Sequence, residues 1–433
     1  MDTSVRNLGE CRIDTPMPQR IHMNLDHKRF VTDDMKILVD ETAESLASRG
    51  GDISAAPAFE RAGARAKIYF DPSNVKVGIV TCGGLCPGIN NVIAGLVDEM
   101  RTLYGVKEFR GYQYGYQGLA GNTPTIDLTT IDLQAIRGQG GSILGTSRGN
   151  QDPKLIVDTL VKDGISIFFV IGGDGTMRGA EAIYQEITNR RLSISVVCIP
   201  KTIDNDVPLI DHSFGFQTAF TEAARAISAG YVEATASRGG ISLIKLMGRY
   251  SGFIACFAAL AETSADFVLI PEVPFAIEGK GGFLEHLEER MREHDYAVIV
   301  VAEGAGQEHF SEVRELDASG NKRLADIGGL LRERIQAHFK SINYPISLRY
   351  IDPSYAIRSV EANSYDSVYC LQLAQSAVHA AIAGKTGVVV GQFRRRFVHI
   401  PVELLNRETN QVNPNGDLWW SVLENTGQPA HFG

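Results

Sequence analysis

Short runs of β-branched and other apolar residues recur along this chain, and several of them stop at clusters of glycine. The runs lie at residues 75–81, 165–171, 193–199, 241–246, 267–270, 297–302 and 386–391. Helical patterns follow at 90–104 and 177–190, and a long one at 363–383 precedes the last run. Short strands that alternate with helices are typical of parallel sheets with both faces covered. The predicted fold class is therefore α/β, with doubly wound sheets.

Chain length sets the expected number of domains. With 433 residues, 44% of them hydrophobic, the chain is long enough for two large domains, or for one large domain with a substantial insertion. In doubly wound sheets ligands bind beyond the carboxyl ends of the strands, and the polar and glycine-rich clusters of this chain fall at those ends. Residues 1–74 are mixed and polar, with a break at Gly50-Gly51, and are predicted to form an N-terminal extension.

Charge and cysteine content limit the expected partners. The formal net charge of -9 argues against nucleic acid and anionic membranes, so a phosphate ligand requires a local positive site. The six cysteines include no CxxC pair, which favours reduced thiols over disulfides or zinc. No secretory signal pattern and no run of 18 apolar residues is present, so a cytoplasmic location without membrane contact is expected.

Three glycine-rich clusters, 83–88, 140–148 and 172–176, are candidate phosphate-binding loops. Glycine after a strand lets backbone N–H groups approach an anion, and a following helix N-terminus adds a favourable dipole. The clusters match neither a Walker P-loop nor a dinucleotide fingerprint. Asp174 is suited to hold Mg²⁺ against phosphate oxygens, and Arg148 can offer a guanidinium fork. Taken singly, each glycine pair is more often an ordinary turn, and the GGDG element also resembles NAD kinases and lipid kinases.

The segment Pro200–Asp206 (PKTIDND) directly follows the third strand pattern. Its aspartates, Asp204 and Asp206, are two residues apart, so one can accept a hydroxyl proton while the other helps to position a metal ion. An Asx-rich turn that merely closes a strand is the alternative interpretation.

Four motifs together carry a family resemblance. PKTIDND, Met247–Gly252 (MGRYSG), GGDGT and GGxxPGxNN occur in the order found in the phosphofructokinase family, and the resemblance extends from about residue 75 to about 405. It implies transfer of a phosphoryl group from MgATP to the 1-hydroxyl of fructose 6-phosphate. NAD kinases and lipid kinases are disfavoured, because TIDND and MGR are not expected of them.

The resemblance implies a role for each matching position. Asp204 matches the general base, Asp206 its metal-linked companion, and Thr202 a residue that contacts the transferred phosphoryl group. Arg249 matches a group that stabilises the transition state. Thr202 and Asp204 are also expected to touch the sugar. The residues implied to bind ATP are Gly83, Tyr116, Arg148, Gly173, Asp174, Gly175 and Thr176, with Asp174 as the Mg²⁺ ligand.

The remaining sugar-phosphate residues come from three further segments. Met247 and Gly248 match the sugar-binding turn together with Arg249, and Glu303 matches the carboxylate that holds sugar hydroxyls. Arg349, Tyr355 and Arg358 fall at the spacing of the phosphate clamp. In the family the first of these arginines comes from a neighbouring subunit, which implies a homo-oligomer, a dimer or a tetramer, with shared sites.

The resemblance also implies two doubly wound, Rossmann-like αβα domains with the active site in the cleft between them, and the domain limits follow the same correspondence. The implied donor domain comprises 75–215 and 357–405, the fructose 6-phosphate domain 216–356, and a C-terminal tail 406–433. Two positions depart from the bacterial ATP type, since Gly240 stands where arginine is common and Tyr355 where histidine is common. Both differences resemble the branch of the family that contains the pyrophosphate-dependent enzymes.

The phosphoryl donor depends on two positions, Gly175 and Lys201. Pyrophosphate-dependent members resemble one another in having aspartate at the first position and lysine at the second, and this chain has one feature of each type. A carboxylate at 175 would repel an α-phosphate, whereas a lysine excludes neither donor, so ATP is favoured. A pyrophosphate-dependent enzyme remains the first alternative, and a catalytically weak regulatory subunit the second.

Overall fold

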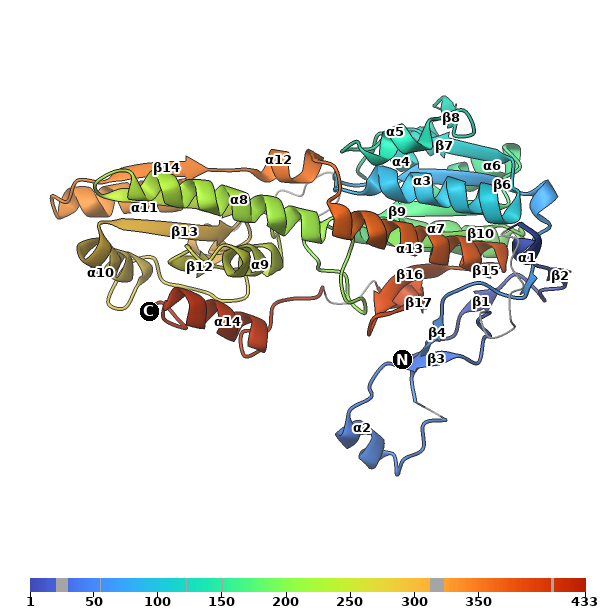
Figure 1. Ribbon diagram of the computed structural model, residues 1–433, viewed down its shortest axis with the longest axis horizontal. Coiled ribbons are helices and arrows are strands. Elements are labelled where there is room, and N and C mark those ends of the chain that lie inside the picture. The colour runs from blue at the N-terminus through green and yellow to red at the C-terminus, as the bar shows by residue number, and fades with distance from the viewer. Residues whose placement is uncertain (21–29, 55, 122, 150, 312–322, 406–408) are drawn as a thin grey trace. The chain divides into compact units, whose positions relative to one another are not determined.

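The computed structural model describes residues 1–20, 30–54, 56–121, 123–149, 151–311, 323–405 and 409–433. The chain divides into two compact units (Figure 1). The first unit comprises Met1–Thr202, Val207–Phe214 and Glu361–Glu408, and the second comprises Ile203–Asp206, Gly215–Val360 and Thr409–Gly433. Both units combine a largely parallel sheet with covering helices, which confirms the predicted α/β class.

The first unit is built on a nine-stranded sheet with the order β3-β4-β17-β16-β10-β9-β6-β7-β8. Its five central strands are parallel, and the pairs toward both edges are antiparallel. The strands span Lys36–Leu38 (β3), Ala58–Arg61 (β4), Lys76–Thr81 (β6), Glu108–Tyr112 (β7), Thr125–Asp127 (β8), Ile167–Gly172 (β9), Ser195–Pro200 (β10), Val388–Phe393 (β16) and Arg396–Pro401 (β17). Short pairs join β1 (Arg6–Asn7) to β15 (Lys385–Thr386) and β2 (Ile13–Asp14) to β5 (Lys67–Ile68).

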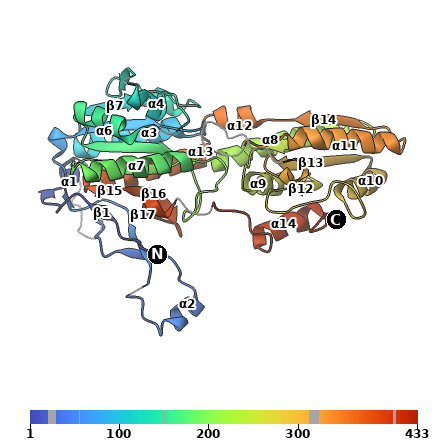
Figure 2. The same ribbon diagram turned by 180° about the vertical axis from the view of Figure 1, so that it is seen from behind.

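Helices cover both faces of this sheet. In Figure 1, α3 and α13 lie in front of it, and in Figure 2, seen from behind, α6 and α7 do so. The close approach of α3 to α13 requires Gly95, since a Cβ there would lie 2.8 Å from the Ala374 Cβ. The helices span Met17–Arg20 (α1), Ala43–Ser48 (α2), Ile89–Glu99 (α3, continued by a π-helical turn at Met100–Tyr104), Gly115–Ala120 (α4), Leu133–Arg137 (α5), Pro153–Lys162 (α6), Asp174–Asn189 (α7) and Ser364–Ile382 (α13). Because both faces are covered, β9 and β10 are buried along their whole length.

The second unit has a four-stranded parallel sheet in the order β12-β13-β11-β14. Its strands span Phe267–Leu269 (β12), Tyr296–Ala302 (β13), Gly240–Leu246 (β11) and Ser347–Ile351 (β14). Its helices span Phe216–Thr235 (α8), Phe253–Ala261 (α9), Phe283–His294 (α10), Ile327–Ser341 (α11), Ser354–Ser359 (α12) and Asp417–Thr426 (α14). Side chains of β11, β13, α10 and α11 form its hydrophobic core, and Phe432 of the C-terminal tail completes that core.

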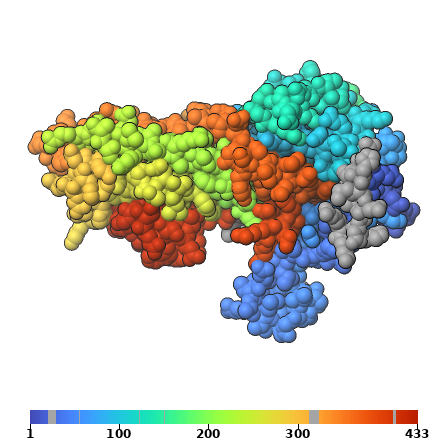
Figure 3. Space-filling view, in the orientation of Figure 1, coloured from blue at the N-terminus to red at the C-terminus, as the bar shows by residue number. Residues whose placement is uncertain are grey.

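The predicted N-terminal extension joins the first unit. Its strand β4 pairs with β17, so residues far apart in sequence share one sheet. The buried Glu60 carboxylate contacts Arg65 at 2.7 Å and Lys385 at 2.8 Å. A buried carboxylate is tolerated only when it is paired, so these contacts hold the extension in one register on the core. In contrast, no residue of α2 is buried, and the segment around it projects from the rest of this unit (Figure 3).

Two further sequence expectations concern the environment. Within the described ranges, no helix is long and apolar enough to cross a membrane. All six cysteines are free thiols, and five of them are buried.

Gly240, where the resemblance leads one to expect arginine, provides the first prediction. A Cβ at this position would lie 1.9 Å from the Ala234 carbonyl oxygen at the end of α8, so no side chain fits without a backbone shift. Gly240→Ala should therefore lower the free energy of unfolding by about 2–3 kcal/mol and Tm by roughly 5–10 °C. The measurement is thermal unfolding, with Gly138→Ala as control, because the nearest atom to a Cβ there is 3.7 Å away. Equal Tm values for the two variants would contradict the packing argument.

Candidate active site

The first unit gathers the predicted donor-binding loops at one edge of its sheet. Strands β6, β9 and β10 are parallel neighbours, with Thr81 opposite Ile171 and Pro200 opposite Gly172. Their carboxyl ends are therefore level, and the three loops that follow them meet. Gly83 donates its N–H to Ser147 O at 2.9 Å and accepts from Thr146 Oγ1 at 2.5 Å, which joins the first two glycine clusters.

Lys201 ties the first glycine cluster to the PKTIDND segment. Its ammonium group donates to the Gly84 carbonyl at 2.6 Å, and its own N–H donates to Gly172 O at 2.9 Å. Gly83 adopts φ +86°, a conformation that favours glycine, and a Cβ there would lie 3.3 Å from Lys201 Nζ. The lysine therefore supplies positive charge within the glycine loop.

The third cluster opens α7. The helix begins at Asp174, so Gly173, Asp174, Gly175 and Thr176 form its N-terminus, where unpaired N–H groups and the helix dipole favour an anion. Helix α7 thus starts three residues before the predicted limit of 177.

Tyr116 contacts the first turn of α7. Its hydroxyl donates to the Thr176 carbonyl at 2.9 Å, its side chain is almost fully buried, and burial raises the pKa of its phenol well above the usual value. This hydrogen bond helps to hold the first turn of α7 in place. A direct contact between Tyr116 and nucleotide remains a prediction.

Arg148 is exposed beside the same loops. Its Nη2 would lie 3.5 Å from a Cβ at Gly84, and it forms no ion pair with any described residue. Such an arginine can donate hydrogen bonds to a polyphosphate without first breaking an ion pair.

The residues present fit a Mg²⁺ ion that is held mainly by substrate phosphates and water, with few protein side chains. No group of three or more His, Cys, Asp or Glu side chains in the described part of the chain could hold a metal by itself. Mg²⁺ is commonly held by one or two carboxylates together with substrate phosphates and water. Asp174, half-buried at the start of α7, is suited to that role.

In the second unit, Asp204 is bound to the MGRYSG turn. Its Oδ2 accepts the Arg249 N–H at 3.3 Å, and its carbonyl accepts Ser251 Oγ at 3.0 Å. Burial, and then the charges of Asp206 and Glu303, raise the pKa of Asp204 far above the usual range, although the Arg249 N–H and charge oppose this shift. Ser251 was not among the predicted residues, and its position inside MGRYSG was the available signal.

Glu303 follows β13 at the level of Met247. Its N–H donates to Leu246 O at 2.9 Å, and the Gly304 N–H donates to Gly248 O at 3.0 Å. Gly248 has φ +126°, and a Cβ there would meet the Ser251 carbonyl at 2.5 Å, so only glycine is accommodated. Burial raises the pKa of Glu303, and the neighbouring Arg249 and Lys245 charges lower it.

Two of the three residues of the predicted phosphate clamp, Tyr355 and Arg358, lie against each other, whereas Arg349 contacts other residues. The guanidinium of Arg358, at the end of α12, lies 4.5 Å from the centroid of the Tyr355 ring, which is 75% exposed. Arg349 lies opposite Ser242 of β11. Ser242 is five residues before Met247, so Arg349 is about 16 Å along the sheet from the level of Met247. It is exposed and contacts Ser347 and Glu233.

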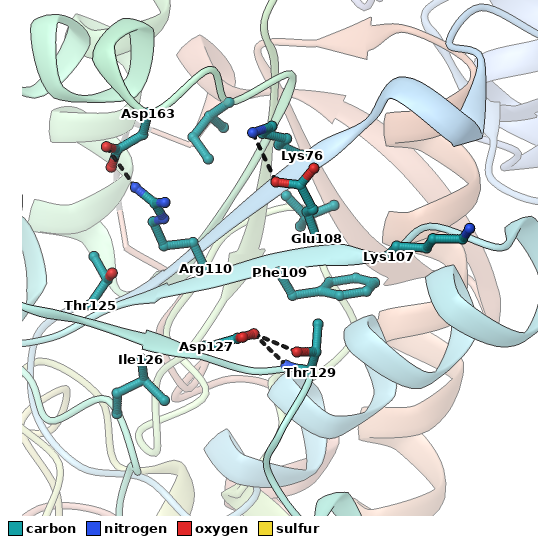
Figure 4. A pocket seen from close by; sticks show the side chains of 12 residues that line it. Lys76, Lys107, Glu108, Phe109, Arg110, Thr125, Ile126, Asp127, Thr129 and Asp163 are labelled. Carbon is teal, nitrogen blue, oxygen red and sulfur yellow. Dashed lines mark hydrogen bonds and ion pairs between the residues drawn. The ribbon is translucent and has the colours of Figure 1, made fainter.

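A separate pocket of about 250 Å³ lies at the opposite ends of the strands (Figure 4). Its charged side chains are largely paired, Lys76 with Glu108 at 2.8 Å and Arg110 with Asp163 at 2.6 Å. None of the predicted site residues lines this pocket.

Known proteins resemble this chain over most of its length. Residues 76–381 match the family described as Phosphofructokinase. The chain is 52% identical to a protein of Amycolatopsis methanolica named ATP-dependent 6-phosphofructokinase, with 100% of this chain and 96% of that protein covered. A protein of the same name from Borreliella burgdorferi is 44% identical, with 99% and 97% covered. The solved structure of a pyrophosphate-dependent phosphofructokinase from Marinobacter aquaeolei superposes with a TM-score of 0.68 at 20% identity, with 81% of this chain and 91% of that chain covered, and it supports the fold alone.

The family match covers more than half of the chain, and two named relatives align along almost its whole length at 44% identity or more. With the glycine loops, PKTIDND and MGRYSG in the positions described, the chain belongs to the phosphofructokinase family.

Proposed function

We propose that this chain is an ATP-dependent 6-phosphofructokinase, which transfers the γ-phosphoryl group of MgATP to the 1-hydroxyl of fructose 6-phosphate. The observation that carries the proposal is the convergence of three glycine-rich loops on the N-terminus of α7, beside Lys201 and Arg148. Such a cluster of N–H groups and cations suits a polyphosphate. The named relatives of Amycolatopsis and Borreliella support ATP as the donor.

The catalytic groups act mainly through position and charge. Asp204 accepts the proton of the sugar hydroxyl, and its raised pKa makes it a stronger base than an ordinary aspartate. Arg249 and Thr202 would each contact the transferred phosphoryl group. Asp206 would help to position the metal ion. Asp174 would hold Mg²⁺, which would supply positive charge against the donor phosphates.

Binding of the sugar phosphate is assigned to the second unit. Met247, Gly248, Arg249 and Glu303 would hold the sugar, while Tyr355 and Arg358 would hold the 6-phosphate. Arg349 would act in a neighbouring subunit, because it lies about 16 Å along the sheet from Met247 in its own chain. This placement supports a homo-oligomer with shared sites. Free, mostly buried thiols are compatible with a cytoplasmic location.

Donor choice rests on the first turn of α7. Gly175 leaves room beside Asp174, whereas aspartate at this position would place a second carboxylate next to the nucleotide phosphates. Lys201 binds the Gly84 carbonyl and adds a charge that serves either donor. Pyrophosphate therefore remains the alternative donor to be tested directly.

The general base is tested with Asp204→Ser. The change should lower kcat by about 10²–10⁴-fold, because proton transfer from the sugar hydroxyl loses its acceptor. Binding of fructose 6-phosphate, measured by titration calorimetry, should change little. Asp152→Ser serves as control, since serine can replace this aspartate as the N-cap of α6. Unchanged turnover in Asp204→Ser would remove Asp204 as the base.

The donor is tested by initial rates with fructose 6-phosphate and Mg²⁺, comparing ATP with pyrophosphate at equal concentration. Gly175→Asp should reduce kcat/KM for ATP by at least about tenfold, and Gly175→Asn, which is similar in size but uncharged, should reduce it less. The aspartate variant should fold, since acidic residues are favoured in the first turn of a helix. Wild-type activity with pyrophosphate alone would reverse the assignment, and unchanged ATP kinetics in Gly175→Asp would refute the charge argument.

A further inference from the structure

The C-terminal tail crosses the catalytic segments of the second unit. We define the tail strap as residues Asn410–Val412, which precede α14. The Asn410 N–H donates to the Asp206 carbonyl at 2.8 Å, and Gln411 Nε2 donates to the Tyr250 carbonyl at 3.0 Å. Two successive residues of the strap therefore contact the two motifs that carry the proposed catalytic groups.

Glu272 links the third residue of the strap to the same turn. This residue lies just beyond β12, and its Oε1 accepts the Val412 N–H at 2.8 Å and the Gly252 N–H at 2.9 Å. Its Oε2 is shielded from solvent and has no hydrogen-bond partner among the described residues. Burial raises the pKa of Glu272, so a carboxylate here is retained at an energetic cost.

The contact is tight on the Gly252 side. A Cβ at Gly252 would lie 2.4 Å from Ile270 Cγ2 and 3.1 Å from Glu272 Oε2. The turn therefore packs directly on the segment that carries Glu272. Within the turn, Arg249 and Ser251 both donate to Asp204, so displacement of Gly252 would be transmitted to the proposed base.

The rest of the tail is anchored independently. Helix α14 packs against α9 and β12 (Figure 1), and Gln428 forms two hydrogen bonds with the Val268 backbone, at 2.6 and 3.1 Å. The tail thus remains attached to the unit without Glu272. This separates the part of the tail that secures the fold from the part that touches the motifs.

We propose that Glu272 and the tail strap are positioning elements for phosphoryl transfer, which hold the Arg249 backbone and Asp204 in their reactive arrangement. The inference rests on the proposed function in assigning catalytic roles to Asp204 and Arg249. Its physical basis is that loops keep a fixed geometry only through hydrogen bonds and packing, and a displacement of about 1 Å can cost roughly 100-fold in rate.

The test compares Glu272→Leu, which removes the acceptor, with Glu272→Gln, which keeps one. Glu272→Leu should lower kcat about 10- to 100-fold, while KM for ATP stays within about twofold, because the donor loops belong to the first unit. In Glu272→Gln, kcat should stay within about threefold of wild type. Gln428→Leu is the matched control, since it removes two hydrogen bonds that anchor the tail without touching either motif. It should lower Tm but leave kcat within about twofold.

Amide hydrogen exchange of the full-length protein supplies a readout independent of turnover. Exchange in peptides covering 203–206 and 247–252 should increase in Glu272→Leu and stay unchanged in Gln428→Leu. A wild-type chain that proves inactive would refute the proposed function, and the exchange data would still decide whether the strap orders the motifs.

Two results would overturn the inference. One is wild-type kcat and exchange in Glu272→Leu, and the other is an equal loss of kcat in Gln428→Leu, which would indicate general destabilisation. Should Glu272→Leu fail to fold, Gln411→Ala decides the matter, because this hydrogen bond is exposed and its loss should not unfold the protein. A kcat lowered at least about threefold in Gln411→Ala supports the strap, and wild-type kcat contradicts it.

Discussion

The parallel pairing of β6, β9 and β10 is the constraint on which the donor side of the site depends. Ile171 lies opposite both Thr81 and Ile199, so the three strands end at the same level. Their interiors are apolar and buried under helices, which leaves the polar chemistry to the loops at their carboxyl ends. Separate segments of the sequence thereby form one surface, which is the surface proposed to bind the donor phosphates.

The candidate site also requires backbone segments to approach neighbouring residues closely. Glycines at 83, 172 and 248 lie where a Cβ would meet Lys201, Thr176 and the Ser251 carbonyl, respectively. In each case the glycine brings a backbone segment against a residue from the proposed site. The same principle explains Gly240, whose place beside the end of α8 excludes the arginine that the bacterial ATP type often carries. Packing against Ala234 therefore restricts this position to glycine.

Much of the fold was predictable from sequence, since buried strands with continuous apolar runs leave a strong signal. The predicted run 297–302 is β13, and the predicted helix 363–383 is α13 within a residue at each end. Strands β7 and β14 were missed because their exposed residues, among them Glu108 and Arg349, interrupt the apolar pattern. The strands of the N-terminal extension were missed for another reason, since they are short and gain stability by pairing with distant segments.

The sequence by itself determined the α/β class, the family and the residues proposed for catalysis, because these are written in strand-and-glycine patterns and contiguous motifs. It did not reveal Ser251 as a partner of Asp204 or the support of α7 by Tyr116. Nor did it show the strap, in which Glu272 joins Gly252 to Val412, 160 residues later in the chain. Only the tertiary structure decided these contacts, since hydrogen bonds between distant segments depend on how helices and sheets pack and leave no local periodicity in the sequence.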